Sequence, residues 1–128
     1  MSRVFVAIAA ILAALDVAGG AFASHALRPQ VSDRALEIFE TGVRYQMYHA
    51  LALLLIGILL GRAQSGQVLL IVAGSLLLGG IVLFSGSLYL LSFSNILWLG
   101  IITPIGGVAF LAGWICLAIA AFTTKFQT

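Results

Sequence analysis

The sequence predicts an all-α membrane protein with four transmembrane helices in an antiparallel bundle. A short amphipathic interfacial helix is expected between the first and second spans. The 128 residues are 62% hydrophobic and only 8% charged, whereas a soluble domain carries about 25% charged residues. Four apolar stretches approach or exceed the length of about 20 residues that crosses the hydrocarbon. The alternating pattern of barrel strands does not occur.

The four predicted spans follow one another within a single domain, residues 1–128. They cover residues 4–23, 43–60, 68–91 and 96–122. The last two spans contain no charged residue, and short connections join spans two, three and four. These three spans should therefore form successive antiparallel helical hairpins. Because the spans take up most of the chain, a soluble catalytic domain is not expected.

The first span also resembles a secretory signal peptide. Arg3 precedes an apolar run that ends in Ala21-Phe22-Ala23, which fits a small-x-small cleavage site. The run is longer than the usual apolar core of about 7–15 residues, and Asp16 interrupts it. We therefore expect the first span to be retained.

The positively charged residues divide almost evenly between the two sides of the membrane. One side would carry Arg3, Arg62 and Lys125, and the other Arg28 and Arg34, with Arg44 at its edge. The positive-inside rule therefore discriminates poorly. The preferred orientation has both termini in the cytoplasm.

The interfacial helix is predicted over about residues 33–42, after a turn at Pro29. Ser32 is a suitable N-cap, and Asp33 in the first turn suits the helix dipole. The apolar stripe consists of Leu36, Phe39, Val43 and Met47. The charged face consists of Asp33, Glu37, Glu40 and Arg44. Such a helix lies in the membrane interface, and Gly42 could absorb a bend into the second span.

The charged face has two interpretations. It is either a solvated surface, or a docking surface or mouth for a polar ligand. Glu40 and Arg44 are four residues apart in the favourable order, so they can pair on the helix.

Asp16 and His49 are ionisable residues expected inside the membrane. If the boundary lies near Ser24 and Arg44, Asp16 is about 12 Å deep and His49 about 7.5 Å deep on the neighbouring span. An unpaired carboxylate in hydrocarbon is costly, so Asp16 should face the bundle and either find a donor or carry a proton. Candidate donors are His49, Arg44 and Gln46.

These polar residues favour a hydrogen-bonded tie between spans one and two. His25, just past the first span, could join them. A proton relay or a metal site is the alternative, although the spacing matches no recognised metal signature. The single cysteine, Cys116, excludes an intramolecular disulfide. No cofactor and no metal are expected.

The third and fourth spans contain small and polar residues suited to close helix packing. Small residues recur four apart at Gly57 and Gly61, Ser75 and Gly79, and Ala109 and Gly113. Pro104 cannot donate a backbone hydrogen bond, so the carbonyl of Gly100 loses its partner and a kink is expected there.

Four ordered motifs resemble a family of small bacterial membrane proteins. They are residues 20–27 (GAFASHAL), 45–52 (YQMYHALA), 83–89 (LFSGSLY) and 103–114 (TPIGGVAFLAGW). The chain resembles domain of unknown function family 423 over nearly its whole length. It departs from the family pattern at Ala23-Ser24, where glycine-alanine is usual, and at Asp16.

The resemblance implies a four-helix protein of a bacterial inner membrane, of the cytoplasmic or thylakoid type. It supplies no activity, but it draws attention to the polar positions in the motifs, several of which should meet in one cluster. With those found from the residues, the candidate intramembrane cluster is Asp16, His25, Arg44, Tyr45, Gln46, His49, Ser85, Ser87, Tyr89 and Thr103.

A non-enzymatic accessory or structural subunit of a larger membrane complex is the favoured function. The alternative is a transporter for a small solute, an ion or protons that acts as an oligomer. A membrane enzyme with His25 or His49 as base lacks a supporting nucleophile–base spacing. The expected partners are the lipid bilayer and a membrane protein or a second copy. The net charge of +2 does not suggest nucleic acid.

Overall fold

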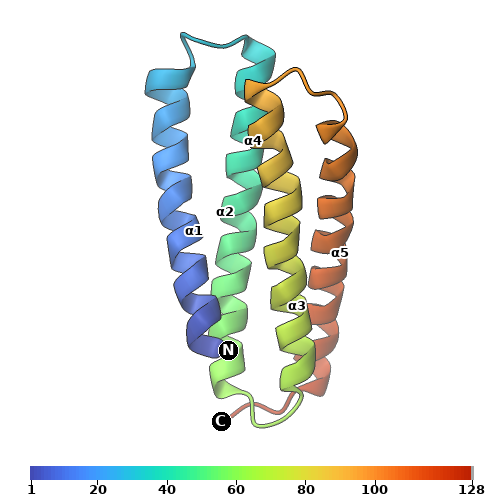
Figure 1. Ribbon diagram of the computed structural model, residues 1–128. Helices are drawn as coiled ribbons and strands as arrows, with labels where there is room; N and C mark the ends of the chain where they lie inside the picture. The colour runs from blue at the N-terminus through green and yellow to red at the C-terminus, as the bar shows by residue number, and fades with distance from the viewer. Residues whose placement is uncertain (128) are drawn as a thin grey trace.

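The computed structural model describes residues 1–127 and confirms the predicted four-helix fold. Four helical segments are long and apolar enough to cross a membrane, namely Ser2–Leu27, Asp33–Arg62, Gln67–Phe93 and Leu99–Thr123. Figure 1 shows them alternating in direction along a common axis. The α1–α2 and α4–α5 connections lie at one end of the bundle, and the α2–α3 connection and both termini lie at the other.

Two of the four spans contain a wider, π-helical turn. The first span is α1 (Ser2–Phe22) followed by the π-helical η1 (Ala23–Leu27). The third is α3 (Gln67–Gly80), the π-helical η2 (Ile81–Ser85) and α4 (Gly86–Phe93). The second and fourth are the single helices α2 (Asp33–Arg62) and α5 (Leu99–Thr123). The sequence did not predict the π-helical turns, which often occur at functional positions.

The interfacial helix predicted over residues 33–42 is the beginning of α2 and not a separate element. Ser32 caps it as expected, since its hydroxyl accepts a hydrogen bond from the backbone N–H of Ala35 at 3.2 Å. Gly42 does not interrupt the helix. A Cβ at this position would lie 2.7 Å from Cε1 of Tyr89. Gly42 therefore permits close approach of a neighbouring helix and is not a hinge.

The apolar stripe predicted at the start of α2 packs into the bundle. Leu36 and Phe39 are buried together with Ala23 and Leu27, and Val43 packs against the same group. The predicted amphipathic pattern is therefore confirmed, although this helix runs along the bundle axis (Figure 1).

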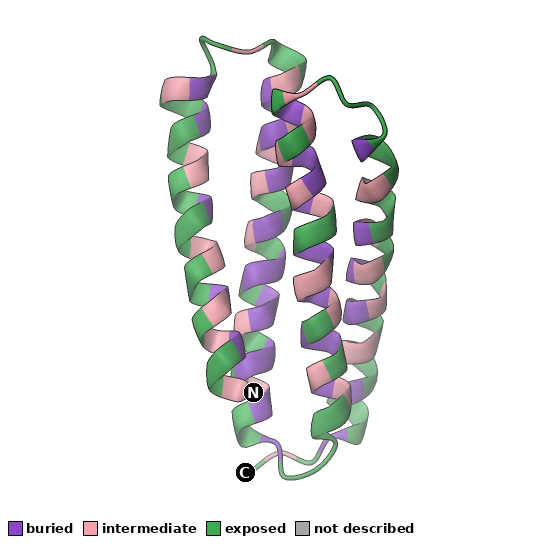
Figure 2. Cartoon of the chain, in the orientation of Figure 1, coloured by how far each residue is buried: buried purple, intermediate pink, exposed green. Residues whose placement is uncertain are grey.

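The main core forms where α2 meets its neighbours. α2 contacts α1 on one side and α3 and α4 on the other, while α5 packs mainly on α3, η2 and α4. Figure 2 shows buried residues along much of α2 and mostly exposed residues on α1. Leu53, Ile56, Leu70 and Leu77 are completely buried. In a membrane the exposed apolar side chains face lipid.

Glycines allow large side chains and backbones to come close. A Cβ on Gly74 would lie 2.5 Å from the Phe5 ring, and one on Gly80 would lie 2.4 Å from Phe110. Gly106 lies directly against the backbone of Phe84. Among the described residues, in contrast, nothing lies within 4 Å of a Cβ on Gly79, so Gly79 does not permit a close helix contact of this kind.

The C-terminal residues pair with the connection between α2 and α3. The N–H of Gln64 donates to the carbonyl of Lys125 at 2.8 Å, and the N–H of Gln127 donates to the carbonyl of Arg62 at 3.0 Å. These bonds fix the end of α5 against the end of α2.

Candidate functional site

The amide of Gln46 connects three helices. Its Nε2 donates a hydrogen bond to the carbonyl oxygen of Leu12 on α1 at 3.0 Å. Its Oε1 accepts a hydrogen bond from the Tyr89 hydroxyl of α4 at 2.9 Å. Gln46 itself is buried on α2. Both ends of the amide are therefore used to hold helices together.

Two further hydrogen bonds join the helices in the same half of the bundle. The hydroxyl of Ser85, at the end of η2, donates to the carbonyl oxygen of Gly42 at 2.7 Å and is completely buried. The hydroxyls of Ser87 on α4 and Thr103 on α5 lie 2.7 Å apart. The wide turn of η2 immediately precedes Gly86, so it helps to set the direction of both serines.

Asp16 is buried on α1 without a hydrogen-bond partner. Only 3% of the residue is exposed, and neither carboxylate oxygen has a partner within residues 1–127. Asp16 was expected to face the interior of the bundle, and its burial agrees with this expectation. However, none of the three candidate donors bonds to it, because Gln46 bonds to Leu12, His49 bonds elsewhere and Arg44 is exposed.

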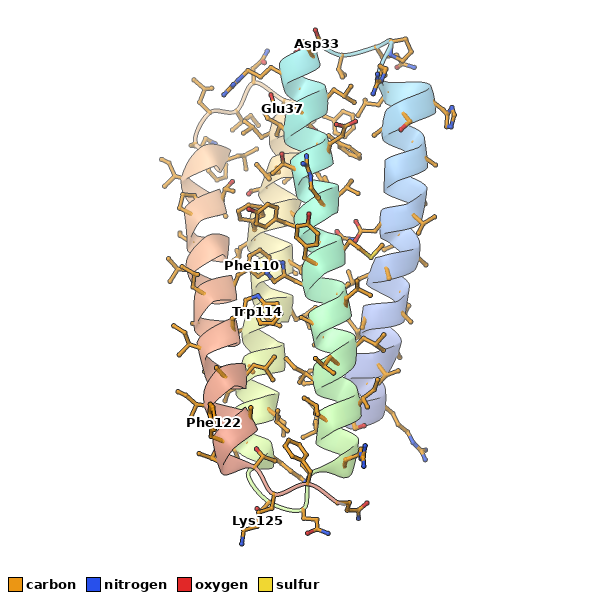
Figure 3. The ribbon with its side chains drawn as sticks, turned by 180° about the vertical axis from the view of Figure 1, so that it is seen from behind. Asp33, Glu37, Phe110, Trp114, Phe122 and Lys125 are labelled. Atoms are coloured by element: carbon orange, nitrogen blue, oxygen red, sulfur yellow. The ribbon has the colours of Figure 1, made fainter. Side chains whose placement is uncertain are left out.

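His49 belongs to an aromatic group between α2 and α5. Its Nδ1 lies 2.6 Å from the carbonyl oxygen of Tyr45, one turn earlier on α2. Its ring stacks on Phe110 of α5, with centroids 3.4 Å apart and an angle of 5° between the planes. Phe84 lies next to Phe110, with ring centroids 5.4 Å apart. Figure 3 shows Phe110 and Trp114 on the side of α5 toward α2.

This aromatic group borders a groove of about 520 Å³. Its aromatic and histidine lining is Tyr45, His49, Phe84, Phe110 and Trp114. Tyr45 and His49 were predicted as site residues from the sequence, whereas Phe84, Phe110 and Trp114 were not. The available signal was the four-residue spacing of Phe110 and Trp114, which puts both on one face of a helix.

The remaining residues of the predicted intramembrane cluster do not join a buried group. His25 and Arg44 are exposed, and Tyr45 is partly exposed beside Phe84. The ten predicted residues are thus spread over several helix interfaces and the surface. No group of three His, Cys, Asp or Glu residues within residues 1–127 is placed to hold a metal ion.

The charged face lies at the end of the bundle that holds the α1–α2 connection. Asp33, Glu37 and Arg44 are exposed, and Figure 3 shows Asp33 and Glu37 at the end opposite Lys125. Glu40 lies 4.0 Å from Arg28, whereas the sequence favoured its pairing with Arg44. Arg28 begins the turn after η1, so its side chain can reach across to α2.

Comparison with known proteins identifies the family. The family described as "Protein of unknown function (DUF423)" matches residues 19–107. The chain belongs to this family. The resemblance predicted from the motifs is therefore confirmed. The matched region contains Gln46, His49, Ser85 and Tyr89, and Asp16 lies outside it.

Curated relatives match this chain along nearly its whole length. The chain is 48% identical over 119 residues to the UPF0382 membrane protein YwdK of Bacillus subtilis. This match covers 93% of the chain and 96% of the relative. It is 46% identical over 120 residues to a UPF0382 membrane protein of Staphylococcus aureus, which covers 94% and 96%. No solved structure matches the chain. Together with the four spans, these relatives establish a membrane protein.

Proposed function

We propose that this chain is a non-enzymatic accessory subunit of a larger membrane complex. The observation that carries the proposal is a surface that we call the charged end. It consists of the exposed or partly exposed side chains of Arg28, Asp33, Arg34, Glu37, Glu40 and Arg44. These are six of the ten Lys, Arg, Asp and Glu residues in the chain.

The charged end has the chemistry of a docking surface. Within residues 1–127 its one ion pair joins Arg28 and Glu40. Asp33 and Glu37 are exposed on one helix, one turn apart, and neither forms an ion pair with another of the described residues. Complementary charges on a partner would increase the association rate and fix its orientation. The rigid helix α2 holds these groups in a defined pattern.

The interior supports a structural role. Gln46, Tyr89, Ser87 and Thr103 all form hydrogen bonds between helices. Such bonds stabilise the association of transmembrane helices. A compact bundle that carries six of its ten charged side chains at one end suits a subunit that a partner binds in place.

Transport by an oligomer is the second candidate function. The buried carboxylate of Asp16 favours it, because ionisable groups inside membranes often mark ion or proton pathways. The polar groups that could continue a pathway from Asp16 are bonded to one another. A second copy would therefore have to supply the rest of the route. A flux of ions or protons into proteoliposomes that is present with the wild type and lost with Asp16→Asn would establish transport.

The proposal includes an orientation with both termini in the cytoplasm. The charged end would then face the opposite side of the membrane, because the termini lie at the other end of the bundle (Figure 1). A C-terminal fusion to green fluorescent protein should fluoresce, and a C-terminal alkaline phosphatase fusion should be inactive. The reverse pattern would invert the orientation.

A pull-down from native membranes in a mild detergent tests the accessory role. The tagged chain should recover a stoichiometric membrane-protein partner, identified by mass spectrometry. The double variant Asp33→Lys, Glu37→Lys should recover at least ten-fold less partner. The matched control, Arg62→Glu with Lys125→Glu, reverses two charges at the other end and should recover the wild-type amount. Equal recovery with both double variants would refute the assigned docking surface.

A further inference from the structure

The groove between α2 and α5 has the size of a small-molecule site. Its volume is about 520 Å³, and ligand pockets occupy about 300–1,000 Å³. Tyr45 and His49 come from α2, Phe84 from η2, and Phe110 and Trp114 from α5. The charged end does not contribute to its lining.

The groove opens sideways to the region occupied by lipid. Val108 and Leu111 line it, and both are 65% exposed on the outer surface of α5. Trp114 also lines it and is 43% exposed. α5 is one of the membrane-spanning helices. A ligand would therefore enter from the bilayer, and an apolar tail could remain among the lipid chains.

The lining favours a flat ring over an acyl chain. His49 and Phe110 form a nearly parallel stack. Tyr45 and Phe84 lie beside it, with ring centroids 4.7 Å apart. Aromatic surfaces interact best with other rings in offset-stacked or edge-to-face arrangements. A planar ring that lies in the groove against these side chains can stack on one of them and meet another edge-on.

His49 offers this ring a hydrogen-bond acceptor. Its Nδ1 contacts the carbonyl oxygen of Tyr45, which can only accept, so Nδ1 carries the hydrogen. In the neutral imidazole Nε2 then has a free lone pair. Within residues 1–127, buried polar side-chain atoms without partners occur in Asp16 and Thr124. Nε2 of His49 forms no hydrogen bond in that part of the chain, so it is not fully buried, and His49 lines the groove.

We propose that the groove binds a hydroxylated aromatic ring with an apolar tail, and that the ring hydroxyl donates a hydrogen bond to Nε2 of His49. Alkylphenols and quinols have this chemistry. A plain acyl chain would fill the groove but leave Nε2 without a donor. This binding activity goes beyond the accessory role, because it uses a different face of the bundle.

A matched pair of probes tests the proposal with the full chain in detergent micelles. The probes are 4-octylphenol and 4-octylanisole, which differ because the methyl ether has no hydroxyl donor. In a Trp98→Phe background the sole tryptophan is Trp114, and its fluorescence reports occupancy of the groove. After correction for partitioning into protein-free micelles, the phenol should bind about 3- to 10-fold more tightly, as one hydrogen bond allows.

The variant His49→Phe distinguishes the contribution of the hydrogen bond from the contribution of ring stacking. This variant keeps a ring that can stack on Phe110 but removes the acceptor, so both probes should bind with equal affinity. Equal binding of the two probes to the parent protein would overturn the proposal, because the groove would then accept any apolar molecule. Failure of the phenol to change the Trp114 signal would overturn it as well.

The variant Gly107→Leu tests whether the phenol binds in the groove. This test does not depend on whether the His49 variant folds. Gly107 lines the groove, and a Cβ there would meet only Cδ2 of Phe84, at 4.0 Å. A leucine would fill the groove and should weaken phenol binding at least ten-fold. The control is Gly100→Leu on the same helix, where nothing lies within 4 Å of a Cβ. Equal phenol binding by the two variants would refute the groove as the site.

Discussion

The hydroxyl of Tyr89 donates a hydrogen bond to Oε1 of Gln46 across 2.9 Å and joins α4 to α2 inside the bundle. The same amide donates to Leu12 on α1. One glutamine therefore connects three of the four spans. Since lipid is as apolar as the helix surfaces, such bonds and close packing are what hold membrane helices together.

Replacing Gln46 with leucine should destabilise the protein. The substitution introduces an apolar side chain of similar size and leaves the Tyr89 hydroxyl without its partner. We expect a loss of about 1–2 kcal/mol in the free energy of unfolding. The measurement is unfolding in mixed dodecylmaltoside and SDS micelles, followed by circular dichroism.

The control for Gln46→Leu is Ser94→Ala. Ser94 directly follows α4, and its hydroxyl donates an exposed hydrogen bond to the carbonyl of Leu90 in the same segment. Loss of this bond should change stability by less than about 0.5 kcal/mol. Tyr89→Phe added to Gln46→Leu should cost little more than Gln46→Leu alone. Fully additive losses would show that the two side chains do not act as a pair.

Substitution of two neighbouring glycines by alanine should have different effects on stability. A Cβ on Gly106 would lie 2.4 Å from the backbone nitrogen of Phe84, whereas one on Gly107 would lie 4.0 Å from the nearest atom. Gly106→Ala should therefore cost about 1–3 kcal/mol, because α5 must move away from η2. Gly107→Ala should be neutral or stabilise by up to about 1 kcal/mol. The same unfolding assay measures both, and equal effects would refute the close contact at Gly106.

Removing the carboxylate of Asp16 should increase stability. Both of its oxygens are buried and have no partner within residues 1–127. Replacing an unsatisfied buried polar group with an apolar one removes a cost of about 1–3 kcal/mol. Asp16→Val should therefore unfold at a higher SDS fraction than the wild type. The control Glu37→Val changes an exposed carboxylate beyond the first turn of α2 and should have little effect. A destabilised Asp16→Val would mean that the carboxylate has a stabilising partner.

The ion pair between Arg28 and Glu40 should contribute little to stability. Its atoms are 4.0 Å apart, and the side chains are 64% and 41% exposed. Exposed pairs of this kind contribute about 0–1 kcal/mol. Arg28→Gln should leave the unfolding transition almost unchanged in both low and high salt. A large loss in low salt that disappears in high salt would assign the pair a real structural role.

The sequence predicted the helices well because their lengths follow from the thickness of the membrane. Apolar runs of this length have few alternatives to a spanning helix. The cap at Ser32 and the stripe through Leu36 and Phe39 were also predictable, since they depend on residues close together in the chain. The prediction of a separate interfacial helix was wrong, because α2 runs without a break from Asp33 to Arg62. The contact between Gly42 and Tyr89 could not be predicted, since Tyr89 lies 47 positions further along the chain.

The arrangement of the polar side chains was harder to predict. Asp16 and His49 are similar in expected depth, which suggested contact. Their side chains make different contacts, since His49 stacks on α5 while Asp16 is buried on α1, which packs against α2. Depth follows from position in the sequence, but direction around a helix also depends on which neighbour it packs against. The π-helical turns at Ala23–Leu27 and Ile81–Ser85 change that direction locally.

The apparent mass of the natively expressed chain tests the central claim, the role as an accessory subunit, most directly. A chain tagged at its natural expression level would be extracted in digitonin and separated on a native gel. We predict that it migrates with a complex much larger than its own 13.4 kDa, and that Asp33→Lys, Glu37→Lys releases it from that complex. Migration of the wild type as a small homo-oligomer would contradict the account and favour transport.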